Sequence, residues 1–327
     1  MTGEKKIEPF RGSFFGKDVI SVEQFTDKKE IEDLFKIATK MKRSVEERKK
    51  RDDLKGFCIA ELFYQPSTRT YTSFYAAAQR LGVSYFIPLH GMAAYSSTVK
   101  GESLPDTIRT IEQTTAADLI ILRHPDDSSS EQAALYTQVP IINAGSGTKE
   151  HPTQAILDLY TIKEELGKMD GLEVVMLGDL KNGRTIKSLA KLMAVMAPKT
   201  KITFVSPTGL EAPLDFIKGL KNKGLVIKET DNLDKVLPSA DVLYVTRIQK
   251  EWFTDPEEYR RVQGSYIITP ELMRKAKRKM IVMHPLPRVE EIDPNFDSDP
   301  RVAYFKQMRN GLYTRMALLT AVLRKTV

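Results

Sequence analysis

Short apolar segments alternate with helix-forming segments along almost the whole chain of 327 residues. The apolar segments lack the alternation of a strand with one wet face, which is typical of strands covered on both faces. They are residues 56–63, 84–87, 118–122, 139–143, 173–177, 201–205, 241–246 and 279–283. An example of a helix begins at the capping box of Asp27 and Glu30, followed by apolar residues with helical spacing: Ile31, Leu34, Phe35, Ala38 and Met41. The alternation predicts an α/β protein with two doubly wound parallel sheets.

The length favours two domains, because one domain usually takes about 100–200 residues. We place the boundary near Gly145-Ser146-Gly147, before a helix that bridges the two halves. The expected domains are therefore residues 1–150 and 151–307.

The composition excludes several classes of protein. No apolar run approaches the roughly 18 residues of a membrane span, and the first residues lack the apolar core of a secretory signal. The single cysteine, Cys58, excludes an intrachain disulfide, and the four histidines have no metal-ligand spacing. The net charge of +7 is assigned to solvated helix faces rather than to a nucleic-acid surface. We expect a cytoplasmic protein that needs no metal and no organic cofactor.

In folds of this type, ligands bind at the carboxyl ends of the strands. After the first predicted strand, Ser67-Thr68-Arg69-Thr70 opens a helix with free N–H groups, hydroxyls and a guanidinium, which indicates a phosphate site. The alternative is an ordinary Ser/Thr cap with a solvated arginine.

Two later strands of the first half end in Arg123 and in a loop that leads to His151. Pro152 suits the first position of a helix, and Gln154 lies on the same turn. Because the helix dipole disfavours an imidazolium there, we predict a neutral His151 ring that donates to a carbonyl oxygen. The alternative is a structural histidine.

The second half has the segment GDLKNGRT after a strand, with Arg184 where a P-loop needs lysine. Because of this arginine, and because no GxGxxG follows a strand, nucleotide binding is the weaker hypothesis. Arg247 follows another strand, as Arg69 and Arg123 do in the first half. Four arginines at strand ends, without an obvious catalytic carboxylate or nucleophile, indicate a polyanionic site that works by positioning and charge stabilisation.

The motifs, taken together, resemble those of the catalytic chains of aspartate carbamoyltransferases. They extend from the helix at Asp27 to the final helix at Arg315–Leu323 and read FYQPSTRT, KGESLPDTIRT, LRHP, NAGSGTKEHPTQAILDLYTI, GDLKNGRT, TRIQKE and HPLPRVEEID. Carbamoyltransferases that use ornithine typically carry a cysteine in an HCLP turn, whereas this chain has His284-Pro285-Leu286-Pro287. The resemblance therefore favours the aspartate branch.

The resemblance implies a role for each matched residue. Phosphate of carbamoyl phosphate would be bound by Ser67, Thr68, Arg69 and Thr70, and its carbonyl would be polarised by Thr70, Arg123 and His151, with Gln154 near the carbamoyl amide. The aspartate carboxylates would be held by Arg184, Arg247 and Gln249, and backbone carbonyls would be offered by Pro285 and Leu286. A C-terminal helix, 308–327, would pack back onto the first domain.

The resemblance also implies a homotrimer with shared sites, since Ser96 and Lys100 would lie on a loop that enters the neighbouring subunit's site. From the residues alone, this segment is a solvent loop. The implied reaction is attack of the aspartate amine on the carbamoyl carbonyl, through a tetrahedral oxyanion, with release of phosphate. Phosphate itself can take the amine proton, so no carboxylate base is required. Regulatory chains are a further possible partner.

Four positions depart from the family pattern: Gln65 replaces glutamate, Trp252 replaces arginine, Lys187 replaces histidine and Ser146 replaces aspartate. In the family, the glutamate at the position of Gln65 pairs with the arginines at the positions of Arg184 and Trp252 and ties the domains together around substrate. Loss of this pairing predicts that the two domains close more weakly around the substrate, or that packing of Trp252 replaces the ion pairs. It also predicts a changed affinity for aspartate or a different second substrate. Two alternatives to an aspartate enzyme stay open: a non-catalytic paralogue and a carbamoyltransferase for another amino acid.

Overall fold

The computed structural model describes residues 8–325. The chain divides into two compact units. Of the described residues, 8–157 and 309–325 form unit 1, and 158–308 form unit 2. The divisions fall inside two helices, α6 (Pro152–Leu166) and α11 (Tyr304–Leu323), so each of these helices contributes residues to both units.

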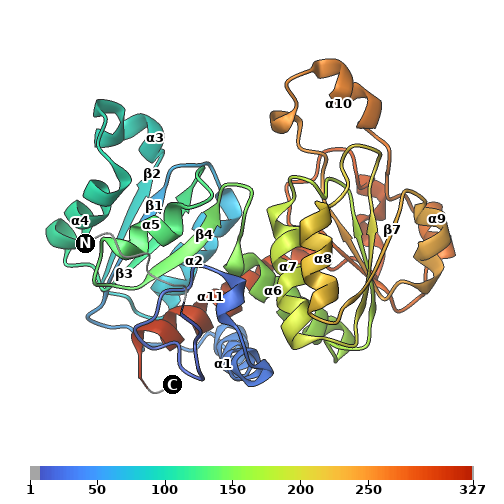
Figure 1. Ribbon diagram of the computed structural model, residues 1–327. Coiled ribbons are helices and arrows are strands. Elements are labelled where there is room, and N and C mark those ends of the chain that lie inside the picture. The colour runs from blue at the N-terminus through green and yellow to red at the C-terminus, as the bar shows by residue number, and fades with distance from the viewer. Residues whose placement is uncertain (1–7, 326–327) are drawn as a thin grey trace. The chain divides into compact units, whose positions relative to one another are not determined.

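Unit 1 is built on a four-stranded parallel sheet with the order β2–β1–β3–β4 (Figure 1). Its strands are β1 (Cys58–Phe63), β2 (Tyr85–His90), β3 (Leu119–His124) and β4 (Ile141–Ser146). Its own helical segments are η1 (Val22–Gln24), α1 (Lys28–Glu46), α2 (Thr68–Arg80), α3 (Met92–Tyr95), η2 (Ser97–Lys100), α4 (Leu104–Thr115) and α5 (Ser129–Leu135). The central strand β1 leads directly to α2, so the end of β1 places the start of that helix.

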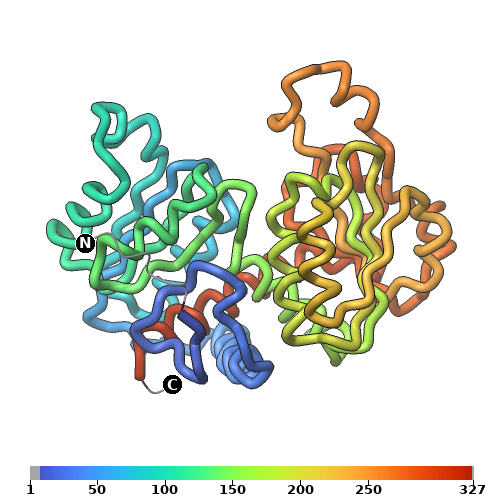
Figure 2. The backbone as a smooth tube through the Cα atoms, in the orientation of Figure 1, coloured from blue at the N-terminus to red at the C-terminus, as the bar shows by residue number. Residues whose placement is uncertain are grey.

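The two ends of the described chain lie side by side in unit 1. Figure 2 shows the red C-terminal segment next to the blue N-terminal one, and the N–H of Gly16 donates to the carbonyl of Val322 at 2.9 Å. The C-terminal residues of α11 are almost all buried there, among them Met316 and Leu319. The last helix is therefore part of the core of unit 1.

Unit 2 is built on a five-stranded parallel sheet with the order β7–β6–β5–β8–β9. Its strands are β5 (Glu173–Leu177), β6 (Lys201–Val205), β7 (Val226–Thr230), β8 (Val242–Val245) and β9 (Ile281–Met283). Its own helical segments are α7 (Arg184–Met196), α8 (Leu214–Asn222), α9 (Leu233–Val236), η3 (Leu237–Ser239), η4 (Lys250–Trp252), α10 (Pro256–Val262), η5 (Leu272–Lys275) and η6 (Pro294–Ser298).

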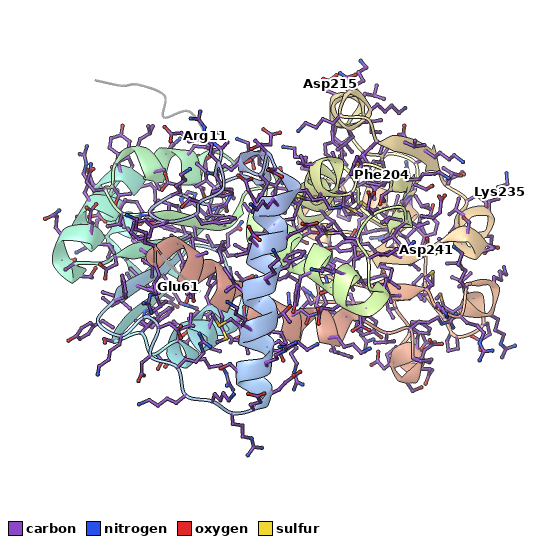
Figure 3. All side chains as sticks on the ribbon, turned by 90° about the horizontal axis from the view of Figure 1, so that it is seen from below. Arg11, Glu61, Phe204, Asp215, Lys235 and Asp241 are labelled. Carbon is purple, nitrogen blue, oxygen red and sulfur yellow. The ribbon has the colours of Figure 1, made fainter. Side chains whose placement is uncertain are left out.

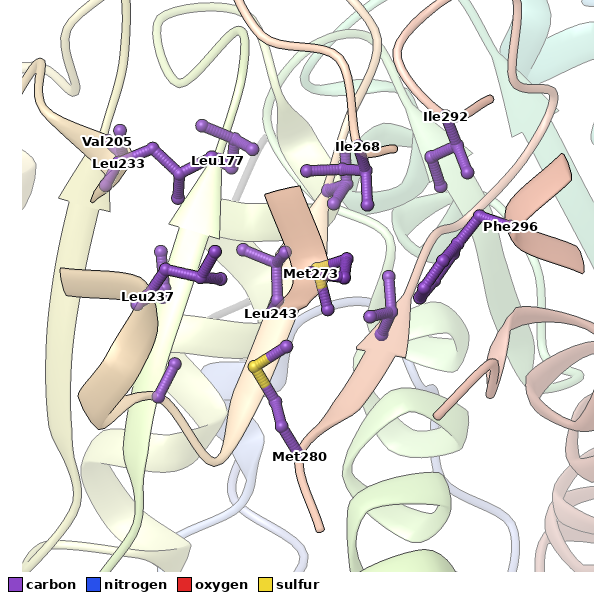
Figure 4. Close-up of a cluster of buried hydrophobic side chains, with 14 of the residues drawn as sticks. Leu177, Val205, Leu233, Leu237, Leu243, Ile268, Met273, Met280, Ile292 and Phe296 are labelled. Carbon is purple, nitrogen blue, oxygen red and sulfur yellow. The ribbon is translucent and has the colours of Figure 1, made fainter. Parts of the chain in front are cut away.

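One face of the unit 2 sheet packs into a continuous apolar core. Figure 4 shows Leu177 of β5 and Leu243 of β8 on this face, together with Met273 of η5 and Phe296 of η6. These four side chains are at most 1 % exposed. Each buried side chain of this size stabilises the fold by roughly 1.5–3 kcal/mol relative to an exposed one. This core therefore fixes β5 and β8, and with them the points from which the following loops start.

The predicted α/β class with two parallel sheets is confirmed. The strands expected at 173–177 and 201–205 have the predicted bounds, and the capping box of Asp27 and Glu30 opens α1 as expected. The expectation of a fully covered strand at 84–87 is wrong. β2 is an edge strand with Tyr85 65 % exposed. β7 was not predicted at all, because its sequence VIKET has only two apolar residues and only Ile227 is buried.

Candidate active site

The first turn of α2, at the end of β1, is where the sequence predicts a phosphate site. Ser67 precedes the helix in an extended conformation, and its side chain makes no capping hydrogen bond, so the alternative of an ordinary cap is wrong for this residue. Thr68 is exposed and Arg69 is partly exposed, whereas Thr70 is buried. The first N–H groups of a helix have no partner within the helix, and the dipole adds positive potential, which together suit a phosphate.

His151 lies immediately before α6, where Pro152 is the first helical residue as predicted. The ring is 4 % exposed. Its Nε2 lies 3.4 Å from Oγ1 of Thr70, and its Nδ1 lies 3.4 Å from Oγ1 of Thr153. The buried Gln154 is on the same turn, and its N–H donates to the carbonyl of His151 at 3.0 Å. The structure thus brings Thr70, in the first turn of α2, together with the predicted histidine.

Arg123 occupies the end of β3, between the ends of β1 and β4. Its Nη1 donates to the carbonyl of Ala144 at 3.0 Å, and its own carbonyl accepts the N–H of Tyr64 at 2.9 Å. Because β1, β3 and β4 are adjacent parallel strands, the segments that follow them meet at one edge of the sheet. The predicted residues 67–70, Arg123 and His151 therefore share this edge.

Ser96 and Lys100 lie on a separate projection formed by α3 and η2, which follows the edge strand β2 (Figure 1). The hydroxyl of Ser96 contacts atoms of this projection, the carbonyl of Met92 and the hydroxyl of Thr98. Lys100 is exposed. Within this chain, the hydrogen bonds of Ser96 are thus those of a self-contained loop.

Two buried residues of unit 1 that the sequence analysis did not select lie close to the predicted site. Arg315 of α11 donates through Nη1 to Oγ of Ser73 at 2.7 Å and through Nη2 to Oγ1 of Thr153 at 3.5 Å. Thr153 in turn contacts His151. No local signal in the sequence marks Arg315, because Ser73 and Thr153, to which it donates these hydrogen bonds, are 242 and 162 positions away.

The second residue, Glu61, is labelled in Figure 3. It lies in the middle of β1 and is fully buried. Within residues 8–325, neither carboxyl oxygen has a hydrogen-bond partner, and Nε2 of His90 is 3.9 Å from Oε2. Burial raises the pKa of Glu61 to about 9, against the opposing charge of Arg315. The side chain is therefore a neutral acid at pH 7.

In unit 2, Arg184 is the first residue of α7 and follows the loop after β5. This loop requires glycine at position 178, where φ is +120° and a Cβ would lie 2.2 Å from the carbonyl oxygen of Thr246. The buried carboxylate of Asp179 accepts the backbone N–H and the side-chain amide of Asn182. The N–H groups of Leu180 and Lys181 also donate to the carbonyl of Leu210, so contacts inside and outside the loop hold the segment that leads to Arg184.

Arg247 and Gln249 follow β8. The guanidinium of Arg247 donates to both carboxylate oxygens of Glu251, with 2.9 Å between Nη1 and Oε2. This pairing raises the pKa of Arg247 and lowers that of Glu251. The side chain of Trp252 is 47 % exposed, and the backbone N–H of this residue donates to the carbonyl of Gln249.

The turn after β9 is fixed by the buried His284. Its Nδ1 accepts the N–H of Leu286 at 2.7 Å, so its Nε2 is the nitrogen that donates to Oε1 of Glu291, also at 2.7 Å. Pro285 and Leu286 are partly exposed on this turn. Arg184, Arg247, Gln249 and the turn thus follow the adjacent strands β5, β8 and β9 of one sheet.

Ser146 and Lys187, the two other departures from the family pattern, make hydrogen bonds to residues of unit 1 and unit 2, respectively. The buried hydroxyl of Ser146 lies 2.8 Å from that of Ser130 and accepts the hydroxyl of Ser129. Lys187 is in the first turn of α7, where its backbone N–H donates to the carbonyl of Gly183.

Among residues 8–325 there is no cluster of three or more His, Cys, Asp or Glu side chains able to hold a metal ion. Over the same range, no helix combines the length and apolarity needed to cross a bilayer.

Two family models together match most of the chain. Residues 17–164 match the carbamoyl-P binding domain of aspartate/ornithine carbamoyltransferase, and residues 170–322 match the Asp/Orn binding domain.

Curated relatives include single-function and multifunctional proteins. The chain is 49 % identical over 312 residues to the aspartate carbamoyltransferase catalytic subunit of Methanopyrus kandleri, covering 95 % of this chain and 98 % of that one. It is 51 % identical over 310 residues to the multifunctional protein pyr1-3 of Dictyostelium discoideum, covering 95 % of this chain but 14 % of that protein. The chain thus spans about one seventh of the multifunctional relatives that it matches.

Solved structures show the same fold. The aspartate transcarbamoylase of Trypanosoma cruzi in complex with carbamoyl phosphate and aspartate is 41 % identical, with a TM-score of 0.89 over 98 % of this chain and 100 % of that one. The catalytic subunit of M. jannaschii aspartate transcarbamoylase is 46 % identical, with a TM-score of 0.84 over 93 % of this chain and 97 % of that one.

Proposed function

The chain belongs to the aspartate/ornithine carbamoyltransferase family, and on this premise we propose that it transfers the carbamoyl group of carbamoyl phosphate to the amine of L-aspartate. The products are N-carbamoyl-L-aspartate and phosphate, which makes the reaction a step of pyrimidine biosynthesis. The observation that carries the proposal is the proximity of Thr70, on the anion-binding turn of α2, to His151 at 3.4 Å. A substrate with a phosphate next to a carbonyl needs an anion-binding helix start and, beside it, a hydrogen-bond donor for the carbonyl oxygen.

The unit 1 residues act on carbamoyl phosphate. Its phosphate is bound by the side chains and N–H groups of the first turn of α2: Ser67, Thr68, Arg69 and Thr70. Its carbonyl oxygen accepts hydrogen bonds from Thr70, Arg123 and His151, and Gln154 faces the carbamoyl amide. These donors stabilise the negative charge that develops on this oxygen when the carbonyl carbon becomes tetrahedral.

The unit 2 residues act on aspartate. Its two carboxylates are bound by Arg184, Arg247 and Gln249, and its amine is oriented by the backbone carbonyls of Pro285 and Leu286. The amine nitrogen bonds to the carbonyl carbon, and the bond from that carbon to the phosphate oxygen then breaks. The departing phosphate takes the amine proton, so the reaction balances without a carboxylate base.

The choice of aspartate over ornithine is supported by the turn after β9, where Leu286 follows Pro285 and no cysteine is present. It is also supported by the relatives, since the Methanopyrus kandleri protein is an aspartate carbamoyltransferase and the Trypanosoma cruzi structure contains aspartate.

The assembly is part of the proposal. The chain forms a homotrimer in the cytoplasm, and Ser96 and Lys100 complete the site of the neighbouring subunit. The exposure of the α3–η2 projection, with Tyr95 90 % exposed, is consistent with a partner at this surface. Regulatory chains are a further possible partner.

One observation supports the second candidate, a paralogue that is inactive or uses another amine. Arg247 is engaged by Glu251, and neither Gln65 nor Trp252 supplies the charge that the family pattern has at its position. All the groups proposed for carbamoyl phosphate are present, so the departures bear on the second substrate.

The purified chain is supplied with carbamoyl phosphate and, in turn, aspartate, ornithine and a panel of other amines, and carbamoylated products are identified by mass spectrometry. We expect N-carbamoyl-L-aspartate. Product with ornithine but not aspartate would overturn the choice of branch. Absence of every product, together with calorimetric binding of a phosphonate bisubstrate analogue, would favour the non-catalytic paralogue.

A further inference from the structure

A directed series of hydrogen bonds connects Arg315 to the ring of His151. Arg315 is 3 % exposed, and its guanidinium has donors only. It therefore donates to Oγ1 of Thr153, at 3.5 Å from Nη2. Because that oxygen accepts from Arg315, the hydroxyl proton of Thr153 is available for Nδ1 of His151, 3.4 Å away.

The direction of these bonds decides where His151 carries its proton. When Nδ1 accepts a hydrogen bond, the neutral ring bears its proton on Nε2. We propose that Arg315 and Thr153 are positioning residues that fix His151 in the Nε2–H tautomer, so that Nε2 donates to the carbonyl oxygen of carbamoyl phosphate. This inference deepens the proposed function and rests on it.

The same guanidinium also acts on the phosphate-binding helix. Its Nη1 donates to Oγ of Ser73 at 2.7 Å, so the hydroxyl proton of Ser73 goes to the carbonyl of Arg69, at 2.6 Å. Arg315 therefore contacts the first turn of α2 through Ser73 and the first turn of α6 through Thr153. Carbamoyl phosphate has its phosphate and its carbonyl in one molecule, so the two helix starts must keep a fixed separation.

Three substitutions separate the positioning role of Arg315 from a purely structural one. The guanidinium lies over the ring of Phe74 at 5.0 Å, so the side chain also packs in the core. Arg315→Met keeps an apolar stem against this ring and removes both donors. Thr153→Val removes only the hydroxyl beside His151, and Thr153→Ser restores it.

The tautomer is measured by nitrogen-15 NMR of the full chain with labelled histidine, without substrate and at a pH where the ring is neutral. The chain has four histidines, and His151→Asn identifies the signal. The control is Thr320→Val in α11, which removes a buried hydroxyl bonded to the carbonyl of Met316. Steady-state kinetics with carbamoyl phosphate and aspartate complete the set.

We expect the Nε2–H form in the wild type, the Thr153→Ser variant and the control. In Thr153→Val and Arg315→Met, we expect a mixture with the Nδ1–H form and a kcat that is lower by about tenfold, with KM for carbamoyl phosphate within about twofold. If Arg315→Met does not fold, Thr153→Val alone decides. An Nδ1–H ring in the wild type, or an unchanged tautomer in Thr153→Val, would overturn the inference. An inactive wild type would instead count against the proposed function, since the NMR measurement needs no turnover.

Discussion

Nε2 of His284 donates a hydrogen bond to Oε1 of Glu291 at 2.7 Å, and the ring is 1 % exposed. The other oxygen of Glu291 accepts the N–H groups of Val289 and Glu290, each at 3.1 Å. One carboxylate thus closes the turn that begins at His284 and exposes Pro285 and Leu286. The geometry of these two carbonyls therefore depends on the side chain of Glu291, at the far end of the turn.

This carboxylate predicts an acid-sensitive contribution to stability. Although burial alone would raise the pKa of Glu291, the hydrogen bond from His284 lowers it below its ordinary value of 4.5. Its contribution to the free energy of unfolding is therefore present above about pH 4.5 and lost as the pH falls through the folded pKa. We expect the stability advantage of the wild type over Glu291→Gln to shrink between pH 6 and pH 3 in urea titrations, whereas the exposed Glu258→Gln gives no such trend. A constant difference would contradict this.

Glu61 predicts a pH dependence of the opposite sign. Its folded pKa of about 9 lies above the ordinary 4.5, so the folded chain keeps a proton that the unfolded chain has released. The free energy of unfolding therefore falls as pH rises between these values, by at most about 1.4 kcal/mol per pH unit. Glu61→Gln cannot titrate, and we expect its advantage over the wild type to grow steadily from pH 5 to pH 9. Parallel stability curves would refute the buried neutral acid.

Arg69 is predicted to bind phosphate through its forked geometry as well as its charge. Lysine keeps the charge but cannot form two parallel bonds to one phosphate. We expect kcat/KM for carbamoyl phosphate to fall by about tenfold in Arg69→Lys and by about a hundredfold in Arg69→Met. The matched control is Arg80→Met, at the exposed end of the same helix. Equal effects at both positions would show that Arg69 has no specific role.

The departures at positions 65 and 252 predict altered use of aspartate. The double substitution Gln65→Glu with Trp252→Arg restores the acid and the base that the family pattern has there, and charge assistance roughly doubles the strength of a hydrogen bond. We expect the aspartate concentration at half-maximal rate to fall several-fold, with the carbamoyl phosphate dependence unchanged. Trp252→Phe, which keeps an aromatic ring, is the control. An unchanged aspartate dependence would show that the two departures do not limit binding.

The sequence by itself determined the α/β class, most of the strands and the residues at their ends, because apolar periodicity, helix caps and strand-end motifs depend on neighbours a few positions away. The strand order was decided by the tertiary structure. It made β2 an exposed edge and added β7, whose last three residues are polar and give no apolar run. Two further features arise only in the folded chain. They are the contact of Arg315 with Ser73, across 242 positions, and the burial of the Glu61 carboxyl without a hydrogen bond from the described residues. Hydrogen-bond direction and burial are properties of packed side chains, and a linear pattern does not specify which distant helix will cover a strand.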